Sequence, residues 1–405
     1  MGFEFNILDV DINIPSDDIR DYTLFISGHP GCGKTTLVKQ IPGSFTIDLD
    51  RGAKSHAMMK QQAGNWLEVK EIVKQLVQAK KMNEKAKKAK NNGEKEVEIK
   101  VGKRKVILPV DIAIEQTGKI KFVSIDTINQ GKQYAKDFIL DKKNQEYLEE
   151  GKDKQLDSFN AIGWGKDDQL ERELMSVIND LRDNGYGVAE VSHIKDKKYN
   201  RDTEDEFIKV VPDLQDNERN YLVGAADIEI QIDVEDVIVE KAEKKNGKIV
   251  KPAVTEQKTW MYLRANTERA AKSRFTYLPE RIEYNYENLV IAVKEAVQKE
   301  IEYGKSIYGL TDEKVNELVN KQDEKKVKQT EEMLEENKKE QEKEQEKESI
   351  NKIIKEIKNK IKALKETVGV PKISEAWISL KIKDPTKVTD IEIAKKVLDN
   401  LNKIA

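Results

Sequence analysis

One short segment has the residue types and spacing of a phosphate-binding loop. Glycines at the first and sixth positions, followed by lysine and a hydroxyl residue, complete the pattern in Gly28-His29-Pro30-Gly31-Cys32-Gly33-Lys34-Thr35, with Thr36 next. Glycines let the backbone curl so that its N–H groups face phosphate oxygens. Lys34 would reach the β- and γ-phosphates, and the Thr35 hydroxyl oxygen would bind Mg²⁺. The segment predicts an ATP and Mg²⁺ site, and the flanking strand and helix patterns disfavour a chance glycine-rich turn.

Acidic residues follow two apolar runs, as expected for side chains that assist phosphate chemistry. Asp126 comes directly after the run at 120–125, and Asp48 and Asp50 follow the run at 45–47. Carboxyl ends of neighbouring parallel strands meet beside the P-loop. We predict that Asp126 holds a Mg²⁺-bound water, with Asp48 as the runner-up, and that Asp50 orients or deprotonates the attacking water. An acidic turn with a helix cap is the alternative for Asp48 and Asp50.

The elements that position these residues have the pattern of an α/β protein. Short apolar runs alternate with longer helical patterns, which predicts a mainly parallel sheet flanked by helices. The expected core strands are 23–27, 44–49, 120–125, 186–191 and 226–232. A lysine-rich insertion at 80–114 contains a predicted hairpin that turns at Gly102 and Lys103. A second predicted hairpin spans 236–263 and turns at Asn246-Gly247.

Composition divides the chain into three parts and excludes several classes of protein. We expect a core at 1–320, a charged linker or solvated helix at 321–349, and a small helical module at 350–405. Charged residues make up 36% of the 405 residues, but the net charge of -3 argues against a generally basic nucleic-acid binder. Cys32 is the only cysteine, which excludes an internal disulfide framework and a zinc site of cysteines. Without signal-peptide features or an apolar run of membrane-spanning length, a cytoplasmic location away from the membrane is expected.

The residues from Tyr22 to Pro279 resemble the small phage-encoded ATPases built on a RecA-like core and associated with single-strand annealing and recombination. The P-loop, the segment 47–50, the glycine-containing loop 161–165 and the strand end at 191–195 carry the resemblance. It implies an ATPase that acts on single-stranded DNA and assembles into a ring or filament in the host cytoplasm. It also implies that Asp50 occupies the place of a catalytic glutamate, and that His193 senses the γ-phosphate. A histidine capping a strand end is the alternative for His193.

Two further segments resemble family elements that bind DNA or a neighbouring subunit. The loop after His193 resembles one that lies on single-stranded DNA, although a mobile surface loop is the alternative because acids follow it. Its candidate DNA-binding residues are Lys195, Lys197, Lys198, Tyr199 and Arg201. Lys272-Ser273-Arg274 resembles the Lys-x-Arg element that RadA-like and DnaB-like proteins insert into a neighbour's nucleotide site, and a solvated basic turn is its alternative. Trp164 is expected to pack as a loop anchor rather than to stack on a base.

Two other functions stay open from the sequence. The chain could be a nucleotide-dependent loader or switch that remodels a protein partner through residues 350–405. It could also bind nucleotide with negligible turnover, because Asp50 is one methylene shorter than glutamate.

Overall fold

The computed structural model describes residues 11–322 except 102–103, 152–154, 201–205, 241–242, 246–247 and 251–252, together with residue 324 and parts of 349–404. The chain forms two compact units, 1–324 and 325–405. Among the described residues, the helices are all too short or too polar to cross a membrane.

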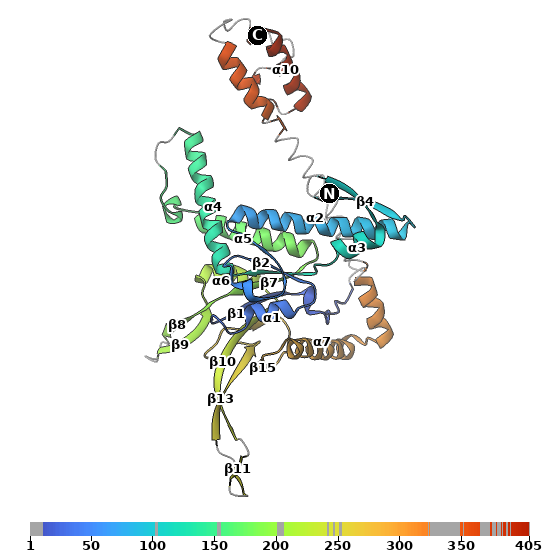
Figure 1. The fold of residues 1–405 in the computed structure, drawn as a ribbon, viewed down its shortest axis with the longest axis vertical. Coiled ribbons are helices and arrows are strands. Elements are labelled where there is room, and N and C mark those ends of the chain that lie inside the picture. Colours follow the sequence, from blue (N-terminus) through green and yellow to red (C-terminus); the bar gives the residue numbers. More distant parts are fainter. Residues whose placement is uncertain are drawn as a thin grey trace. The chain divides into compact units, whose positions relative to one another are not determined.

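A mainly parallel sheet forms the centre of the first unit (Figure 1). In the described part of the chain it has nine strands in the order β15-β13-β10-β1-β7-β6-β2-β3, with β14 paired to β10. The parallel strands are β1 (Thr23–Gly28), β2 (Ser44–Asp48), β3 (Met59–Gln62), β6 (Phe122–Asp126), β7 (Gly187–Ser192) and β10 (Ile228–Glu240). The antiparallel strands are β13 (Ala253–Tyr262), β14 (Lys272–Ser273) and β15 (Arg281–Glu283). The predicted fold class is confirmed.

Helices cover both faces of this sheet, which explains why its central strands are apolar on both sides. The helices α1 (Lys34–Gln40) and α7 (Tyr286–Tyr308) pack on one face, where Leu24 and Ile26 are buried. The other face, which includes Phe25, is covered by α2 (Trp66–Asn91), α4 (Ile128–Glu149), α5 (Lys166–Asp183) and α6 (Asp216–Ala225). The two helical layers are visible above and below the sheet in Figure 1. Short 3₁₀ helices η2 (Ile19–Asp21), η3 (Gly52–Ser55) and η4 (Phe159–Ile162) lie in the connections.

Antiparallel hairpins extend or decorate the core. The predicted hairpin in the insertion is confirmed, because β4 (Glu96–Val101) pairs with β5 (Arg104–Pro109) and Val101 lies opposite Arg104. The insertion starts as the end of α2 and closes with α3 (Val110–Thr117), which shares a small apolar cluster with it. The second predicted hairpin is formed by β10 and β13, and the pairing of β11 (Glu243–Lys245) with β12 (Lys248–Val250) agrees with its predicted turn position. An unpredicted hairpin joins β8 (Ile194–Asn200) to β9 (Glu206–Pro212).

The second unit has an apolar core of its own. Its last helix, α10 (Ile391–Ile404), buries Val397 and Leu401. Ile357, Leu364 and Ile373 are buried in the same cluster. Most of the charged tract at 321–349 lies outside the described residues.

Candidate nucleotide-binding site

The P-loop joins β1 to α1, and each of its three glycines has a geometric reason. Gly31 and Gly33 have φ values of 81° and 103°, which residues with a Cβ rarely adopt. A Cβ on Gly28 would lie 2.5 Å from the Cys32 Sγ and 2.7 Å from the carbonyl oxygen of Ile232. The loop therefore needs glycine at these three positions to keep its tight path between the strands.

Lys34 lies folded over the loop. Its Nζ donates hydrogen bonds of 2.8 Å to the carbonyl oxygen of Gly28 and 2.9 Å to that of His29. The side chain is buried, and this burial lowers the pKa of Lys34, while nearby acids raise it. The ammonium is thus held at the loop by backbone oxygens, where incoming phosphate oxygens could compete for it.

Thr35 and Asp126 bring the first residues of α1 to the end of β6. The Thr35 hydroxyl donates a 2.6 Å hydrogen bond to the Asp126 Oδ2. Burial raises the pKa of Asp126 to about 6, against the lowering effect of the Thr35 hydrogen bond. Asp48, the runner-up, lies opposite Asp126 in the β2–β6 pairing but already accepts a 3.1 Å hydrogen bond from the Lys60 Nζ. Of these two acids, Asp126 is the one that touches the P-loop hydroxyl.

Asp50 lies close to Asp126, so one carboxylate could hold the Mg²⁺-bound water while the other orients the attacking water. Its carboxylate accepts hydrogen bonds of 3.0 Å from the backbone N–H of Thr127 and 3.2 Å from the Thr127 hydroxyl. The Nε2 of His193, at the end of β7, is 3.9 Å from the Asp50 Oδ2. Burial and then the nearby Lys34 lower the pKa of His193, so its ring is mainly neutral at pH 7. The structure therefore brings Lys34, Asp50 and His193 to one edge of the sheet, although their roles stay predictions.

Two side chains from the C-terminal part of the core complete this edge, and no motif in the sequence predicts them. Tyr284, just after β15, donates a 2.8 Å hydrogen bond from its hydroxyl to the carbonyl oxygen of Gly33. Arg269 donates to the Asp233 Oδ2 from Nε at 3.0 Å and from Nη2 at 2.8 Å. Asp233 directly follows Ile232, which lies opposite Gly28 in the β1–β10 pairing.

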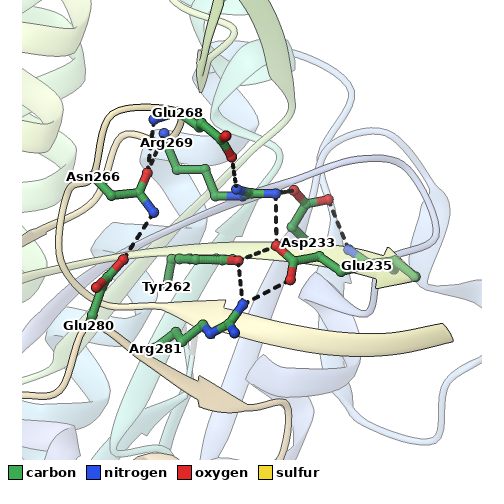
Figure 2. A network of polar contacts seen from close by, with 9 residues as sticks. Asp233, Glu235, Tyr262, Asn266, Glu268, Arg269, Glu280 and Arg281 are labelled. Carbon is green, nitrogen blue, oxygen red and sulfur yellow. Dashed lines mark hydrogen bonds and ion pairs between the residues drawn. The ribbon is translucent and has the colours of Figure 1, made fainter. Parts of the chain in front are cut away.

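Figure 2 shows that the Arg269 and Asp233 pair belongs to a larger polar network at the base of the β10–β13 hairpin. Glu235 accepts from Tyr262 and pairs at 2.9 Å with Arg269 and with Arg281. The guanidinium of Arg269 also lies 4.5 Å from the centre of the Tyr262 ring. These contacts link β10, β13 and β15, and they hold the base of the β10–β13 hairpin beside the P-loop.

The predicted Lys-x-Arg element lies at the opposite edge of the sheet. Lys272 is paired with Glu229 near the start of β10, whereas the P-loop follows the end of β1. The Lys272 Nζ donates to the carbonyl oxygens of Val223 and Gly224 at the end of α6, at 3.1 and 2.9 Å. Arg274 pairs with Asp227 at 3.2 Å. Neither cation contacts its own P-loop in this geometry, and their action on a neighbouring subunit stays a prediction.

The segment predicted to be a long DNA-binding loop is instead the β8–β9 hairpin in its described part. The sequence at 194–200 does not predict a strand, because its mostly polar side chains lack the apolar alternation by which a half-buried strand is recognised. Lys195 pairs with Asp213 at 3.1 Å, and Lys197 pairs with Asp216 at 2.5 Å. Lys198 and Tyr199 lie on the same strand, whereas Arg201 lies outside the described residues.

The prediction that Trp164 packs as a loop anchor is wrong, because its side chain is 100% exposed. Gly163 and Gly165 flank it with φ values of 87° and 79°. Phe159 and Ile162 of η4 take the packing positions against the core instead. An exposed tryptophan between two glycines of this conformation is available for contact with another molecule.

The fold and the P-loop geometry together define a P-loop nucleotide-binding protein. A family model described as an AAA domain matches residues 20–275, and the chain belongs to this family. A comparison with curated proteins finds no match. Among solved structures, a KaiC-like protein from the hyperthermophilic archaeon Pyrococcus horikoshii OT3 is similar over 66% of this chain and 91% of that chain, with 14% identity and a TM-score of 0.25. Similarity this low gives no guide to activity.

Proposed function

We propose that this protein binds ATP with Mg²⁺ at residues 28–36 and hydrolyses it. The observation that supports this most directly is the contact of Thr35 with Asp126, beside the contact of Asp50 with Thr127. A P-loop hydroxyl, a buried carboxylate and a second, half-exposed carboxylate thus lie together at the edge where the P-loop emerges. This is the donor and acceptor set that phosphoryl transfer to water needs.

The residues present fit Mg²⁺, because they offer oxygen ligands, which this ion prefers. Thr35 would bind it directly and Asp126 through water, and both oxygens already lie within hydrogen-bond distance of each other. When bound, the ion neutralises charge on the β- and γ-phosphate oxygens. Lys34 would exchange its two backbone acceptors for phosphate oxygens.

Asp50 is positioned to act on the attacking water. The Thr127 N–H and hydroxyl hold its carboxylate in a fixed orientation, so one water bound to it would be directed rather than free. The His193 ring lies near the same carboxylate and, when neutral, can donate or accept a hydrogen bond near the γ-phosphate. Lys272 and Arg274 would contribute only from a neighbouring copy, in a ring or filament.

The wider role that we propose is action on single-stranded DNA in phage-type recombination or annealing. Support comes from the β8–β9 hairpin, which begins directly after His193 and carries Lys195 and Lys197 on one strand. Both lysines are paired with acids at the surface, and phosphates would have to displace these weak, solvent-screened pairs.

A second candidate is a nucleotide-driven switch that recruits a protein partner. The separate apolar core of the second unit favours it, since residues 350–405 could serve as an adaptor without help from the ATPase core.

ATP turnover with and without single-stranded DNA separates these proposals. The DNA role predicts stimulation by DNA that is lost at high salt, because lysine contacts to phosphates are ionic. Turnover that ignores DNA would favour the switch, and ATP binding without turnover would leave a nucleotide-binding protein only.

A further inference from the structure

Asn129 makes three hydrogen bonds that join separate elements next to the proposed site. It is the second residue of α4, directly after Asp126, Thr127 and Ile128. Its Oδ1 accepts from the backbone N–H of His193 at 3.0 Å and from the Ser192 hydroxyl at 3.1 Å. Its Nδ2 donates to the carbonyl oxygen of Asp213 at 2.8 Å. The amide oxygen thus accepts two hydrogen bonds and the NH₂ group donates one, which uses three of the four hydrogen-bonding positions of a primary amide.

Two of the three partners of this amide are the two ends of the β8–β9 hairpin. His193 directly precedes β8, and Asp213 directly follows β9. The two ends also bond each other, because the Asp213 N–H donates to the carbonyl oxygen of His193 at 2.8 Å. Asn129 therefore closes the base of the hairpin and connects it to the first turn of α4.

The same turn of α4 is fixed to the proposed water-orienting carboxylate. Thr127 caps α4 and donates two hydrogen bonds to Asp50, and the His193 ring lies 3.9 Å from that carboxylate. A path of short contacts thus runs from Asp50 through Thr127 to Asn129, and from Asn129 to the backbone of His193. Movement of the His193 backbone away from the start of α4 requires this amide to break a hydrogen bond.

We infer that Asn129 is a positioning residue, which holds His193 against Asp50 and makes the β8–β9 hairpin move together with the end of β6. This inference rests on the proposed ATPase function. The amide suits the task because an aspartate could not donate to the Asp213 carbonyl oxygen, and an alanine would leave three polar groups without their present partner.

The test compares Asn129→Ala and Asn129→Asp with Asn144→Ala. Asn144 is a matched control, since it lies on the same helix and also uses its amide twice, with the backbone N–H and carbonyl of Leu156. We expect both Asn129 variants to lower kcat about tenfold while KM for ATP stays within about threefold, because the reacting groups lose alignment and the P-loop contacts persist. The control should keep both constants. A general loss of helix α4 would lower the control as well, and it would overturn the inference.

A double variant tests whether Asn129 acts through His193. If it does, adding Asn129→Ala to His193→Ala should lower kcat by less than about twofold beyond the single change, because coupled residues are not additive. Additive losses would contradict the positioning role.

Hydrogen exchange of the nucleotide-free protein provides a measurement that does not depend on hydrolysis. Peptides covering β8 and β9 should exchange faster in both Asn129 variants than in the wild type or in Asn144→Ala. Unchanged exchange would overturn the inference even in an active enzyme. Absence of turnover in the wild type would instead refute the ATPase proposal, and exchange would still decide whether Asn129 holds the hairpin.

Discussion

The hydroxyl of Tyr284 donates a hydrogen bond of 2.8 Å to the carbonyl oxygen of Gly33, which lies 251 residues earlier in the chain. The ring occupies the space beside the loop so closely that a Cβ on Gly33 would lie 2.7 Å from the Tyr284 oxygen. Burial raises the pKa of Tyr284 to about 12, so the phenol stays a donor at any physiological pH. The P-loop is therefore supported from the far end of the core, where α7 begins.

Tyr284→Phe removes this one hydrogen bond and keeps the ring. Loss of one hydrogen bond from the loop should weaken ATP binding by about 1 kcal/mol, or about fivefold in Kd. Isothermal titration with ATP would measure the change. Tyr277→Phe is the matched control, since Tyr277 is 37% exposed, and it should bind as the wild type does. Equal affinities for the wild type and Tyr284→Phe would show that the loop keeps its shape without the tyrosine.

Lys34→Ala should abolish measurable ATP binding, because it removes a cation that the loop holds on its own carbonyl oxygens. Lys39→Ala, in the same helix, serves as the control. Lys39 pairs with His56 at 3.3 Å and not with the loop. Fluorescence titration with a labelled ATP analogue would measure both, and unchanged affinity in Lys34→Ala would refute the P-loop assignment.

Asp50→Asn should leave the Kd for ATP within about threefold of the wild type and lower kcat at least about 100-fold, since a water-orienting carboxylate matters mainly in the transition state. Asp48→Asn gives the contrast. It weakens the buried pair with Lys60 and should lower the unfolding midpoint more than kcat. Single-turnover hydrolysis and thermal unfolding of both variants would decide, and the reverse pattern would exchange the roles of the two acids.

The P-loop, the strand before it and the position of Asp126 could be predicted because each depends on a few neighbouring residues. The expected strand at 23–27 and the observed β1 at Thr23–Gly28 differ by one residue. Tyr284 and Arg269 could not be found in this way, because only packing of the whole sheet brings them to the P-loop. The prediction for Trp164 depends on its aromatic size, which favours burial, but side chains of η4 fill that position instead.

Stability should fall as pH rises, because of a buried carboxyl group on β7. Glu190 is fully buried, its carboxyl oxygens lack hydrogen-bond partners among the described residues, and burial raises its pKa to about 8. An unfolded chain releases this proton near the ordinary value of 4.5. Between these two values the folded chain holds a proton that the unfolded chain lacks, so its stability decreases across this window.

Glu190→Gln should flatten that dependence. In urea unfolding, its free energy of unfolding should match that of the wild type near pH 5. Near pH 9 it should exceed the wild-type value by on the order of a few kcal/mol. Glu295→Gln is the control, because Glu295 is exposed on α7 and should leave the wild-type profile unchanged. A second buried carboxyl, Glu229, has its pKa raised to about 7 by burial and should account for a remaining slope. Parallel profiles for Glu190→Gln and the wild type would contradict the assignment.

Truncation after residue 324 should leave a folded core that still binds ATP. A cut at 320 would be less favourable, because Lys321 pairs with Asp11 at 2.8 Å, and the Gln322 amide donates to the carbonyl oxygen of Ile14 at 3.0 Å and accepts from its N–H at 2.8 Å. Val315 and Leu318 also pack on Ile14. Circular dichroism and ATP titration would test the truncated chain. If it aggregated or lost nucleotide binding, residues 325–405 would have to be counted as part of the ATPase core.

The strand β10 pairs with the P-loop strand over its first five positions and continues without a break into the protruding hairpin. That continuity sets a limit for protein engineering. Loop grafts, affinity tags or shortening can be placed beyond Glu235, outward of the clamp formed by Asp233 and Arg269. A deletion that includes Asp233 removes the residue next to Ile232, which lies opposite Gly28. Such a deletion should be treated as a mutation of the nucleotide site.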